Sequence, residues 1–189
     1  GPKYVGIYAY NYHSPPPSIA VHPHVIVSIA TSFIRGGYTA DELVDFWGAK
    51  ADLLGLREYY YSYRNLPGRG QATDLPYIQR TLTEWHARGA RFINPDNDDA
   101  WGPHGLGLYV MSRILWDTDE AGRIEEIFED FLQKAFAGAA EPMRRFYRRI
   151  VRFTEGETRA RLSEDLVGHM YRDLDEALTL ARDPRIVAR

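Results

Sequence analysis

The sequence contains no cysteine and no long hydrophobic segment. Without cysteine, the chain has no disulfide, no thiolate nucleophile and no zinc–thiolate site. Its apolar runs all fall short of the roughly 20 residues that a membrane-spanning helix requires. We therefore expect neither a covalent cross-link nor a membrane partner.

An excess of basic charge is absent as well. The 23 lysines and arginines are outweighed by 26 aspartates and glutamates, which gives a net charge of -3. Because nucleic-acid binding normally requires a concentrated basic stripe, no nucleic-acid partner is expected. The glycines of residues 102–107 do not have the spacing of a phosphate-binding loop or a dinucleotide fingerprint. No cofactor is expected either.

Aromatic residues are plentiful: 13 Tyr, 8 Phe and 4 Trp among 189 residues. The length and a hydrophobic content of 44% are sufficient for a buried core, in one domain or one domain with an appendage. Abundant aromatic rings are compatible with a sugar-binding surface and equally with an aromatic-packed core. Composition alone does not choose between them.

The first half of the chain alternates strand-like and helix-like segments. Runs rich in β-branched and aromatic residues predict strands over residues 3–10, 25–31, 56–63 and 90–93. Strand, helix and strand at this spacing indicate parallel βαβ units. The fold class predicted from these segments is α/β.

The helices between these strands are predicted from their end signals. Thr39 and Glu42 form a capping box that begins the first helix, and Gly55 is expected to end it. Asp74 is expected to cap the second helix, which Gly89 ends. A third helix is expected over residues 106–116, after a polar loop.

From about residue 118 onward the pattern is helical alone. Apolar stripes predict several helices, one of which begins near Ser163. We place a boundary at residues 116–119, between α/β material and a helical region. Four strands cannot close an eight-stranded barrel, so the chain is interpreted as a fragment, natural or designed.

Polar residues follow each predicted strand. In parallel α/β folds, ligands gather at the carboxyl ends of the strands. Amides, guanidinium groups and aromatic rings in such loops suit a hydroxyl-rich ligand. The candidate ligand-binding residues are Asn11, His13, Arg35, Tyr63, Arg64, Asn94 and Trp101. For Tyr63 and Trp101, packing in the core is the alternative.

The acidic loop after the fourth predicted strand is the candidate for catalysis. Asp96 and Asp98 lie two residues apart, and repulsion between neighbouring carboxylates is one way in which a protein can keep a general acid protonated. Glycoside hydrolases use a pair of carboxylates, which lie about 5 to 5.5 Å apart in retaining enzymes and roughly 6.5 to 9.5 Å apart in inverting enzymes. The alternative is a solvated turn that caps the next helix. A calcium loop is excluded because Trp101 and Gly107 occupy the positions of its glycine and glutamate.

One histidine pair could supply two ligands to a metal ion. His22 and His24 lie two residues apart, just before the strand predicted at residues 25–31, so in an extended segment their side chains point to the same side. A metal site needs a third ligand, and none lies at a recognisable spacing. No metal is therefore expected.

Several segments together resemble a bacterial family that is catalogued as a domain of unknown function. The resemblance covers about residues 4–147, and its most specific part is the Leu-Tyr and Arg-Ile-Leu-Trp-Asp pattern. The matching segments are Ala9-Tyr10 with Pro15-Pro-Pro17, residues 22–27, residues 59–63, residues 105–109 and residues 113–117. That family is similar to glycoside hydrolases, with the layout of α-glucuronidases and β-hexosaminidases.

The resemblance implies that residues 1–117 are the carboxyl-terminal portion of a TIM-type (β/α) barrel and residues 118–189 a helical appendage. The amino-terminal half of the barrel, in the same parent chain, is the implied partner. The general acid of related hydrolases usually lies on a middle strand, before residue 1, so no catalytic residue is carried over. Asp96 occupies the place after a strand where relatives often have a carboxylate.

The expected function is that of a glycoside hydrolase-like protein acting on a polysaccharide or an oligosaccharide that can bear uronic acid. In this interpretation Arg35 and Arg64 hold the acidic group, and Tyr63 and Trp101 stack on the sugar ring. The alternative is a carbohydrate-binding or structural module without catalysis. The fragment by itself is expected to be inactive. The sequence assigns no compartment, and export of the parent protein is compatible with it.

Overall fold

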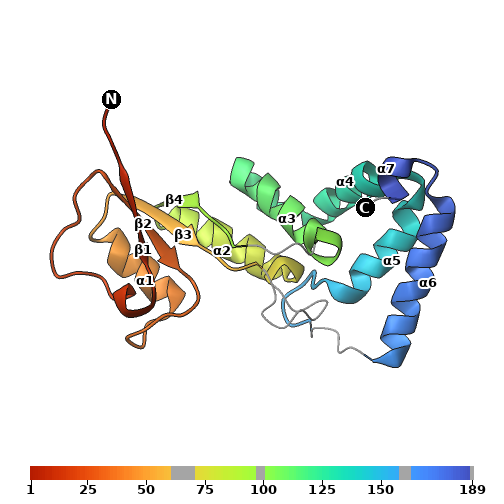
Figure 1. Ribbon diagram of the computed structural model, residues 1–189, viewed down its shortest axis with the longest axis horizontal. Coiled ribbons are helices and arrows are strands. Elements are labelled where there is room, and N and C mark those ends of the chain that lie inside the picture. The colour runs from red at the N-terminus through yellow and green to blue at the C-terminus, as the bar shows by residue number, and fades with distance from the viewer. Residues whose placement is uncertain (61–70, 97–100, 158–162, 188–189) are drawn as a thin grey trace. The chain divides into compact units, whose positions relative to one another are not determined.

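A computed structural model of the protein describes residues 1–60, 71–96, 101–157 and 163–187 (Figure 1). The strands are β1 (Val5–Ala9), β2 (Val25–Ala30), β3 (Leu53–Arg57) and β4 (Ala90–Ile93). The α-helices are α1 (Ala40–Gly48), α2 (Leu75–Ala87), α3 (Trp101–Trp116), α4 (Ile124–Phe136), α5 (Ala140–Ile150), α6 (Glu164–Leu180) and α7 (Pro184–Val187). Short 3-10 helices cover Asn11–His13, Gln71–Thr73, Thr118–Gly122 and Ala137–Ala139.

The chain divides into two compact units. The sheet unit comprises Gly1–Tyr60 and Thr83–Asn97, and the helical unit comprises Tyr61–Leu82 and Asp98–Arg189. The division falls within α2, whose residues belong to both units. No helix of the described residues is both long enough and apolar enough to cross a membrane.

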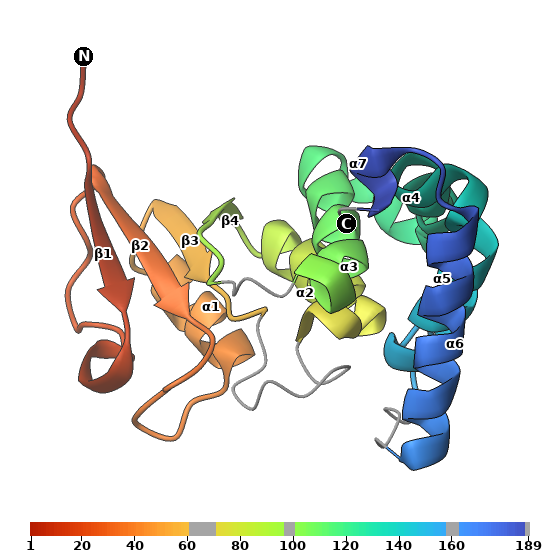
Figure 2. The ribbon, with the colours of Figure 1, turned by 45° about the vertical axis from the view of Figure 1, so that its right-hand side comes forward.

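The sheet unit contains a four-stranded sheet in the order β1-β2-β3-β4, with every neighbouring pair parallel (Figure 2). This confirms the predicted α/β class. The register places Tyr8 beside Ser28, and Ser28 beside Gly55. Because paired residues of parallel strands point to the same side, these three positions belong to one face of the sheet.

The opposite face of the sheet forms the core of this unit with α1. Val27, Ile29, Leu54 and Leu56 are buried there, with Leu43, Val44 and Trp47 of α1. The Trp85 indole of α2 donates to the carboxylate of Asp41 on α1 at 2.8 Å. Helix and strand side chains thus pack as the apolar periodicity of the sequence predicts.

Three helices begin at the predicted caps, and at the start of α2 the Asp74 carboxylate accepts from the Tyr77 backbone N–H at 3.2 Å. Thr39 and Glu42 form the complete capping box at the start of α1. Ser163 accepts from the Leu166 backbone N–H at the start of α6. At the other end of α2, Gly89 has a φ of +102°, the left-handed region that favours glycine.

The prediction that Gly55 ends the first helix was wrong. Helix α1 ends at Gly48, and Gly55 lies in the middle of β3. A Cβ atom at position 55 would lie 3.0 Å from the Cβ of Phe92 on β4, so this glycine allows the two strands to approach. The third strand consequently begins at Leu53, earlier than predicted.

Helix α3 also begins earlier than predicted, at Trp101 in place of residue 106. Pro103 lies in its first turn, where a missing backbone N–H is tolerated. The glycines at 102, 105 and 107 concealed the helical pattern because glycine is a poor helix former. Trp101 is therefore a helix residue and not part of a polar loop.

In the helical unit, α5 and α6 run side by side and are joined by a buried carboxylate (Figure 2). The Nε atoms of Arg145 and Arg149 donate to Asp173 at 3.0 and 2.8 Å. The side chain of Asp173 is 6% exposed, whereas those of Arg145 and Arg149 are 35% and 29% exposed. Asp173 thus ties two α5 side chains to α6.

Replacing Asp173 with Asn is expected to lower the free energy of unfolding by about 2 kcal/mol at neutral pH. The substitution removes the buried negative charge that pairs with two arginines, and because these arginines are partly exposed, the loss is smaller than for a fully buried ion pair. Burial opposes ionisation, but the two arginines outweigh it and lower the pKa of Asp173. The ionised Asp173 therefore stabilises the folded protein at pH values above the ordinary aspartate pKa. This stabilisation is lost as the pH falls through the lowered pKa of Asp173 in the folded protein. Urea unfolding of both proteins at neutral and acidic pH should show the difference shrinking in acid.

Candidate functional site

Polar and aromatic side chains gather at the carboxyl edge of the sheet. The loops that follow β1 and β2, the residues that follow β3, and the residues that follow β4 all lie at this edge, because the strands are parallel. Backbone hydrogen bonds continue the β3–β4 pairing beyond the strands, from Asn94 to Leu56 and from Asp96 to Glu58. This extension fixes the positions of Asn94 and Asp96 relative to β3.

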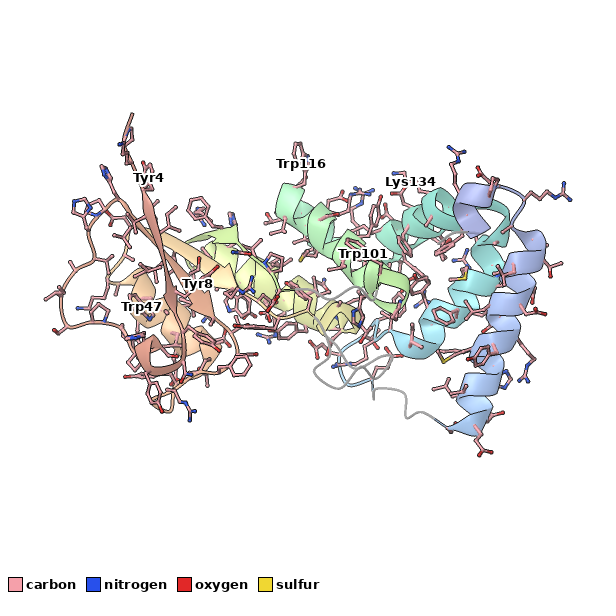
Figure 3. The ribbon with its side chains drawn as sticks, viewed as in Figure 1. Tyr4, Tyr8, Trp47, Trp101, Trp116 and Lys134 are labelled. Carbon is pink, nitrogen blue, oxygen red and sulfur yellow. The ribbon has the colours of Figure 1, made fainter. Side chains whose placement is uncertain are left out.

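Arg57 is the centre of a chain of polar contacts across three strands. Its Nη1 donates to the Asn94 side-chain oxygen at 3.1 Å, and its Nη2 is 3.0 Å from a carboxylate oxygen of Asp96. The Asn94 amide donates in turn to the Tyr8 hydroxyl oxygen at 3.0 Å. Tyr8 lies on β1 (Figure 3), so the chain Tyr8–Asn94–Arg57–Asp96 spans the sheet from β1 to β4.

An aromatic row accompanies this polar chain. The Phe33 ring lies 5.7 Å from the ring of Tyr10 and 5.7 Å from the ring of Tyr59, with edge contacts at both. The Arg57 guanidinium lies 5.8 Å from the centre of the Tyr59 ring. Burial raises the pKa of the Tyr59 hydroxyl, Tyr10 raises it further, and Arg57 opposes the rise. Tyr59 therefore stays neutral, as a hydrogen-bonding group, at physiological pH.

A second cation lies in the loops after β1 and β2. The Nε of Arg35 donates to the Asn11 side-chain oxygen at 3.1 Å, and its guanidinium lies 5.6 Å from the centre of the Tyr12 ring. Tyr12 is 80% exposed. This arrangement leaves a charged planar group and an open aromatic face beside each other at the surface.

Two residues of these loops have backbone conformations that are uncommon outside glycine. Asn11 has a φ of +53° and Phe33 a φ of +61°. Asparagine adopts this region more readily than most residues, whereas for phenylalanine the conformation is strained. Such strain persists where the surrounding structure fixes it, and it is frequent at binding sites.

The residues that follow β3 and β4 include two described carboxylates, which lie in different environments. The Asp96 side chain is 37% exposed and paired with Arg57. Glu58 is completely buried and accepts from the Tyr59 backbone N–H at 2.8 Å. By strand alternation Glu58 belongs to the face opposite Arg57 and Tyr59. Of these two carboxylates, Asp96 is thus the one that a ligand can reach.

The structure brings several of the predicted site residues together. Asn94 and Asp96 share Arg57 as a partner, and Asn11 holds Arg35. His13 is exposed in the 3-10 helix after β1. Trp101 is 64% exposed and belongs to the helical unit. The predicted residues Tyr63, Arg64 and Asp98 lie outside the described residues.

Arg57 and Tyr8 were not predicted from the sequence. Arg57 could have been found from its position two residues before Tyr59, because alternate residues of a strand lie on the same face. The signal for Tyr8 was weaker, because near-continuous apolar strands do not reveal which face carries a ligand. Both residues became recognisable through their contacts with Asn94.

No metal-binding group is formed by the described residues: His, Asp and Glu side chains do not gather there in threes. His22 uses its Nδ1 locally, as an acceptor for the His24 backbone N–H at 3.1 Å. Comparison of the chain with models of protein families, with curated proteins and with solved structures finds no match.

Proposed function

We propose that the carboxyl edge of the sheet binds carbohydrate and that the sheet is part of a glycoside hydrolase-type (β/α) barrel. The observation that carries the proposal is the chain Tyr8–Asn94–Arg57–Asp96 beside the aromatic row of Tyr10, Phe33 and Tyr59. A phenol, an amide, a guanidinium and a carboxylate offer donors and acceptors to sugar hydroxyls. Aromatic faces cover the C–H side of a sugar ring.

The order of the strands supports the barrel. Parallel strands that follow one another in sequence order, with helices packed on one face, are the repeating unit of a (β/α) barrel. A doubly wound sheet would reverse its strand order at a switch point. The carboxyl edge is the end of a barrel at which enzymes place their active sites.

The exposure of β1 is evidence that further strands pair with this edge of the sheet in the parent protein. Its burial pattern leaves Val5, Ile7 and Tyr8 at 61%, 40% and 51% exposure, on both faces of the strand. Strands of parallel sheets are normally covered on both faces. We propose that the remaining strands of the barrel, from the same parent chain, pair with β1 and, together with the helices of the barrel, cover Val5 and Ile7, which lie on the face opposite Tyr8.

The charges at the edge favour an acidic sugar as the ligand. Arg35 is exposed, and its Asn11 contact uses Nε alone, so its remaining N–H groups can bind a uronic acid carboxylate. Tyr12 offers its ring to the same ligand. Hydrolysis in the parent protein requires a second carboxylate besides Asp96, for which Asp98 is the candidate within this chain.

Replacing Tyr8 with Phe is expected to weaken sugar binding about 3- to 10-fold, as the loss of a neutral hydrogen bond predicts. The Tyr8 hydroxyl oxygen accepts from Asn94, so its own hydrogen is available to a ligand. Two-dimensional amide NMR titration of the full chain with methyl glucuronide and with methyl glucoside would measure the dissociation constants.

Tyr4→Phe is the matched control, because Tyr4 is equally exposed but precedes β1 at the amino end of the strand. It should bind both sugars as the unchanged protein does. Absence of shifts at the carboxyl edge with either sugar, or identical affinities for the two tyrosine variants, would contradict the proposal.

A further inference from the structure

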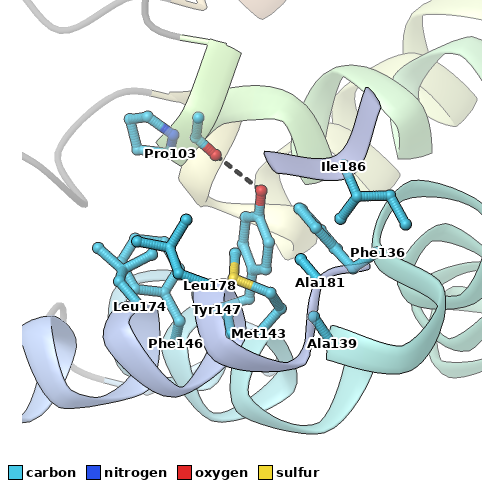
Figure 4. Close-up of a pocket in the computed structure, with 12 residues that line it drawn as sticks. Pro103, Phe136, Ala139, Met143, Phe146, Tyr147, Leu174, Leu178, Ala181 and Ile186 are labelled. Carbon is cyan, nitrogen blue, oxygen red and sulfur yellow. Dashed lines mark hydrogen bonds between the residues drawn. The ribbon is translucent and has the colours of Figure 1, made fainter. Parts of the chain in front are cut away.

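The helical unit contains a pocket that takes no part in the carbohydrate site. It has a volume of about 380 Å³ and lies between the first turn of α3, the end of α4, α5, α6 and α7 (Figure 4). Its walls include Met143 and Phe146 of α5, Leu174 and Leu178 of α6, and Ile186 of α7. A volume above about 300 Å³ and a mainly apolar lining are typical of small-molecule sites, which occur between the helices of bundles.

The hydroxyl group that lines this pocket is already paired. Tyr147 donates to the Gly102 carbonyl of α3 at 2.7 Å. Burial raises the pKa of Tyr147, so the phenol stays protonated and neutral. A charged ligand would lose its hydration here without gaining a charged partner from the lining. Water would find few polar groups, and apolar cavities of this kind favour apolar guests.

Small side chains keep the space open. Ala139, Ala177 and Ala181 stand among the large apolar residues of the lining. Leu178 lines the pocket and is nevertheless 56% exposed. A guest that covers this leucine would remove apolar surface from water, which is the main driving force for binding such a molecule.

We propose that this pocket binds an uncharged apolar molecule, or the uncharged apolar part of a larger one. The proposal rests on the size, lining and paired hydroxyl of the pocket and is independent of carbohydrate binding at the sheet. The recognised chemistry is aromatic or alkyl carbon, held by leucine, methionine and phenylalanine side chains. Charged and polyhydroxylated compounds are expected to be excluded.

The chain offers a site-specific probe in its three methionines. Met143 lines the pocket, whereas Met111 lies on α3 and Met170 on α6, outside the lining. The full chain, labelled with ¹³C at the methionine methyl groups, would be titrated with N-phenyl-1-naphthylamine, an uncharged aromatic amine. We expect a saturable shift of the Met143 methyl signal, a much smaller change at Met111, and an increase in probe fluorescence.

Ala181→Phe is the variant that tests the location. Ala181 follows α6 with extended backbone angles, φ -72° and ψ 104°, so a larger side chain fits the backbone there and fills the pocket. We expect it to weaken probe binding about tenfold or more while the far-ultraviolet circular dichroism stays unchanged. Thr179→Phe adds the same ring on exposed α6 surface and should leave binding unchanged.

Three results would overturn the proposal. One is equal shifts of all three methionines, which indicate nonspecific binding. Another is undiminished binding by Ala181→Phe. The third is a Met143 shift that appears with rising protein concentration before any probe is added, which indicates that a second copy of the chain fills the pocket. Loss of sugar binding at the sheet would have no bearing on these results.

Discussion

Replacing Gly107 with Ala is expected to destabilise the helical unit by about 3 kcal/mol or more, the upper range for overpacking a close-packed site. A Cβ atom at this position would lie 1.8 Å from the Ala72 carbonyl oxygen and 2.6 Å from its carbonyl carbon. Both residues are buried, and the obstacle is backbone, not the end of a flexible side chain. Helix α3 or the Gln71–Thr73 segment must therefore move.

Thermal and urea unfolding of the full chain would measure this effect. For a chain of this size a loss of about 3 kcal/mol corresponds to a fall in Tm of roughly 6 to 12 °C. Gly105→Ala is the matched control, two residues away on the same helix. Its Cβ would meet Phe131 at 3.7 Å, an ordinary contact, and alanine is the better helix former by about 1 kcal/mol. Equal stability of the two variants would show that the close approach of α3 is not required.

This close approach explains part of what the sequence concealed. Local end signals, such as the box formed by Thr39 and Glu42, predicted helix starts correctly because their hydrogen bonds form between near neighbours. Gly55 and Gly107 were harder to interpret. Their role is to admit a segment distant in sequence, Phe92 in one case and Ala72 in the other, and no local pattern carries that information.

The site was partly predictable for a related reason. The carboxyl ends of parallel strands meet at one edge whatever the side chains are, so Asn11, Arg35, Asn94 and Asp96 could be assigned to a common edge in advance. Which of them pair depends on register and on loop geometry. Arg57 was missed because its partners lie 37 and 39 positions further along the chain, at Asn94 and Asp96. The positive φ of Phe33 was not predictable either, because phenylalanine rarely adopts a left-handed backbone conformation.

The pocket of the helical unit had no sequence signal at all. Met143 and Phe146 on α5, and Leu174 and Leu178 on α6, fit an ordinary apolar stripe, and such a stripe predicts a packed core. Whether the helices meet completely or leave space depends on the small residues between them and on their crossing. Periodicity identifies which face is buried, and tertiary packing alone decides whether that face is filled.

In the parent protein proposed above, Asp96→Asn is expected to lower kcat for glycoside hydrolysis by about 10²- to 10⁴-fold, the contribution typical of a general acid or base. This follows from the proposal that Asp96 is the accessible carboxylate of the sugar-binding edge. The substitution keeps the size of the side chain and one acceptor oxygen, so Arg57 retains a hydrogen-bonding partner and the fold should persist. Hydrolysis of aryl glycosides, with circular dichroism as a check on folding, would measure the effect.

Asp45→Asn provides the control for this experiment. Asp45 is also an aspartate of the sheet unit that faces an arginine, with a carboxylate oxygen 3.6 Å from Arg88, but it lies on α1 away from the carboxyl edge. Loss of that exposed pair should change stability by less than about 1 kcal/mol and leave kcat unaltered. If Asp96→Asn hydrolyses aryl glycosides as fast as Asp45→Asn, then Asp96 holds no role in the reaction. The chain Tyr8–Asn94–Arg57–Asp96 would in that case act in binding alone, which the sugar titration of the Tyr8 variant measures separately.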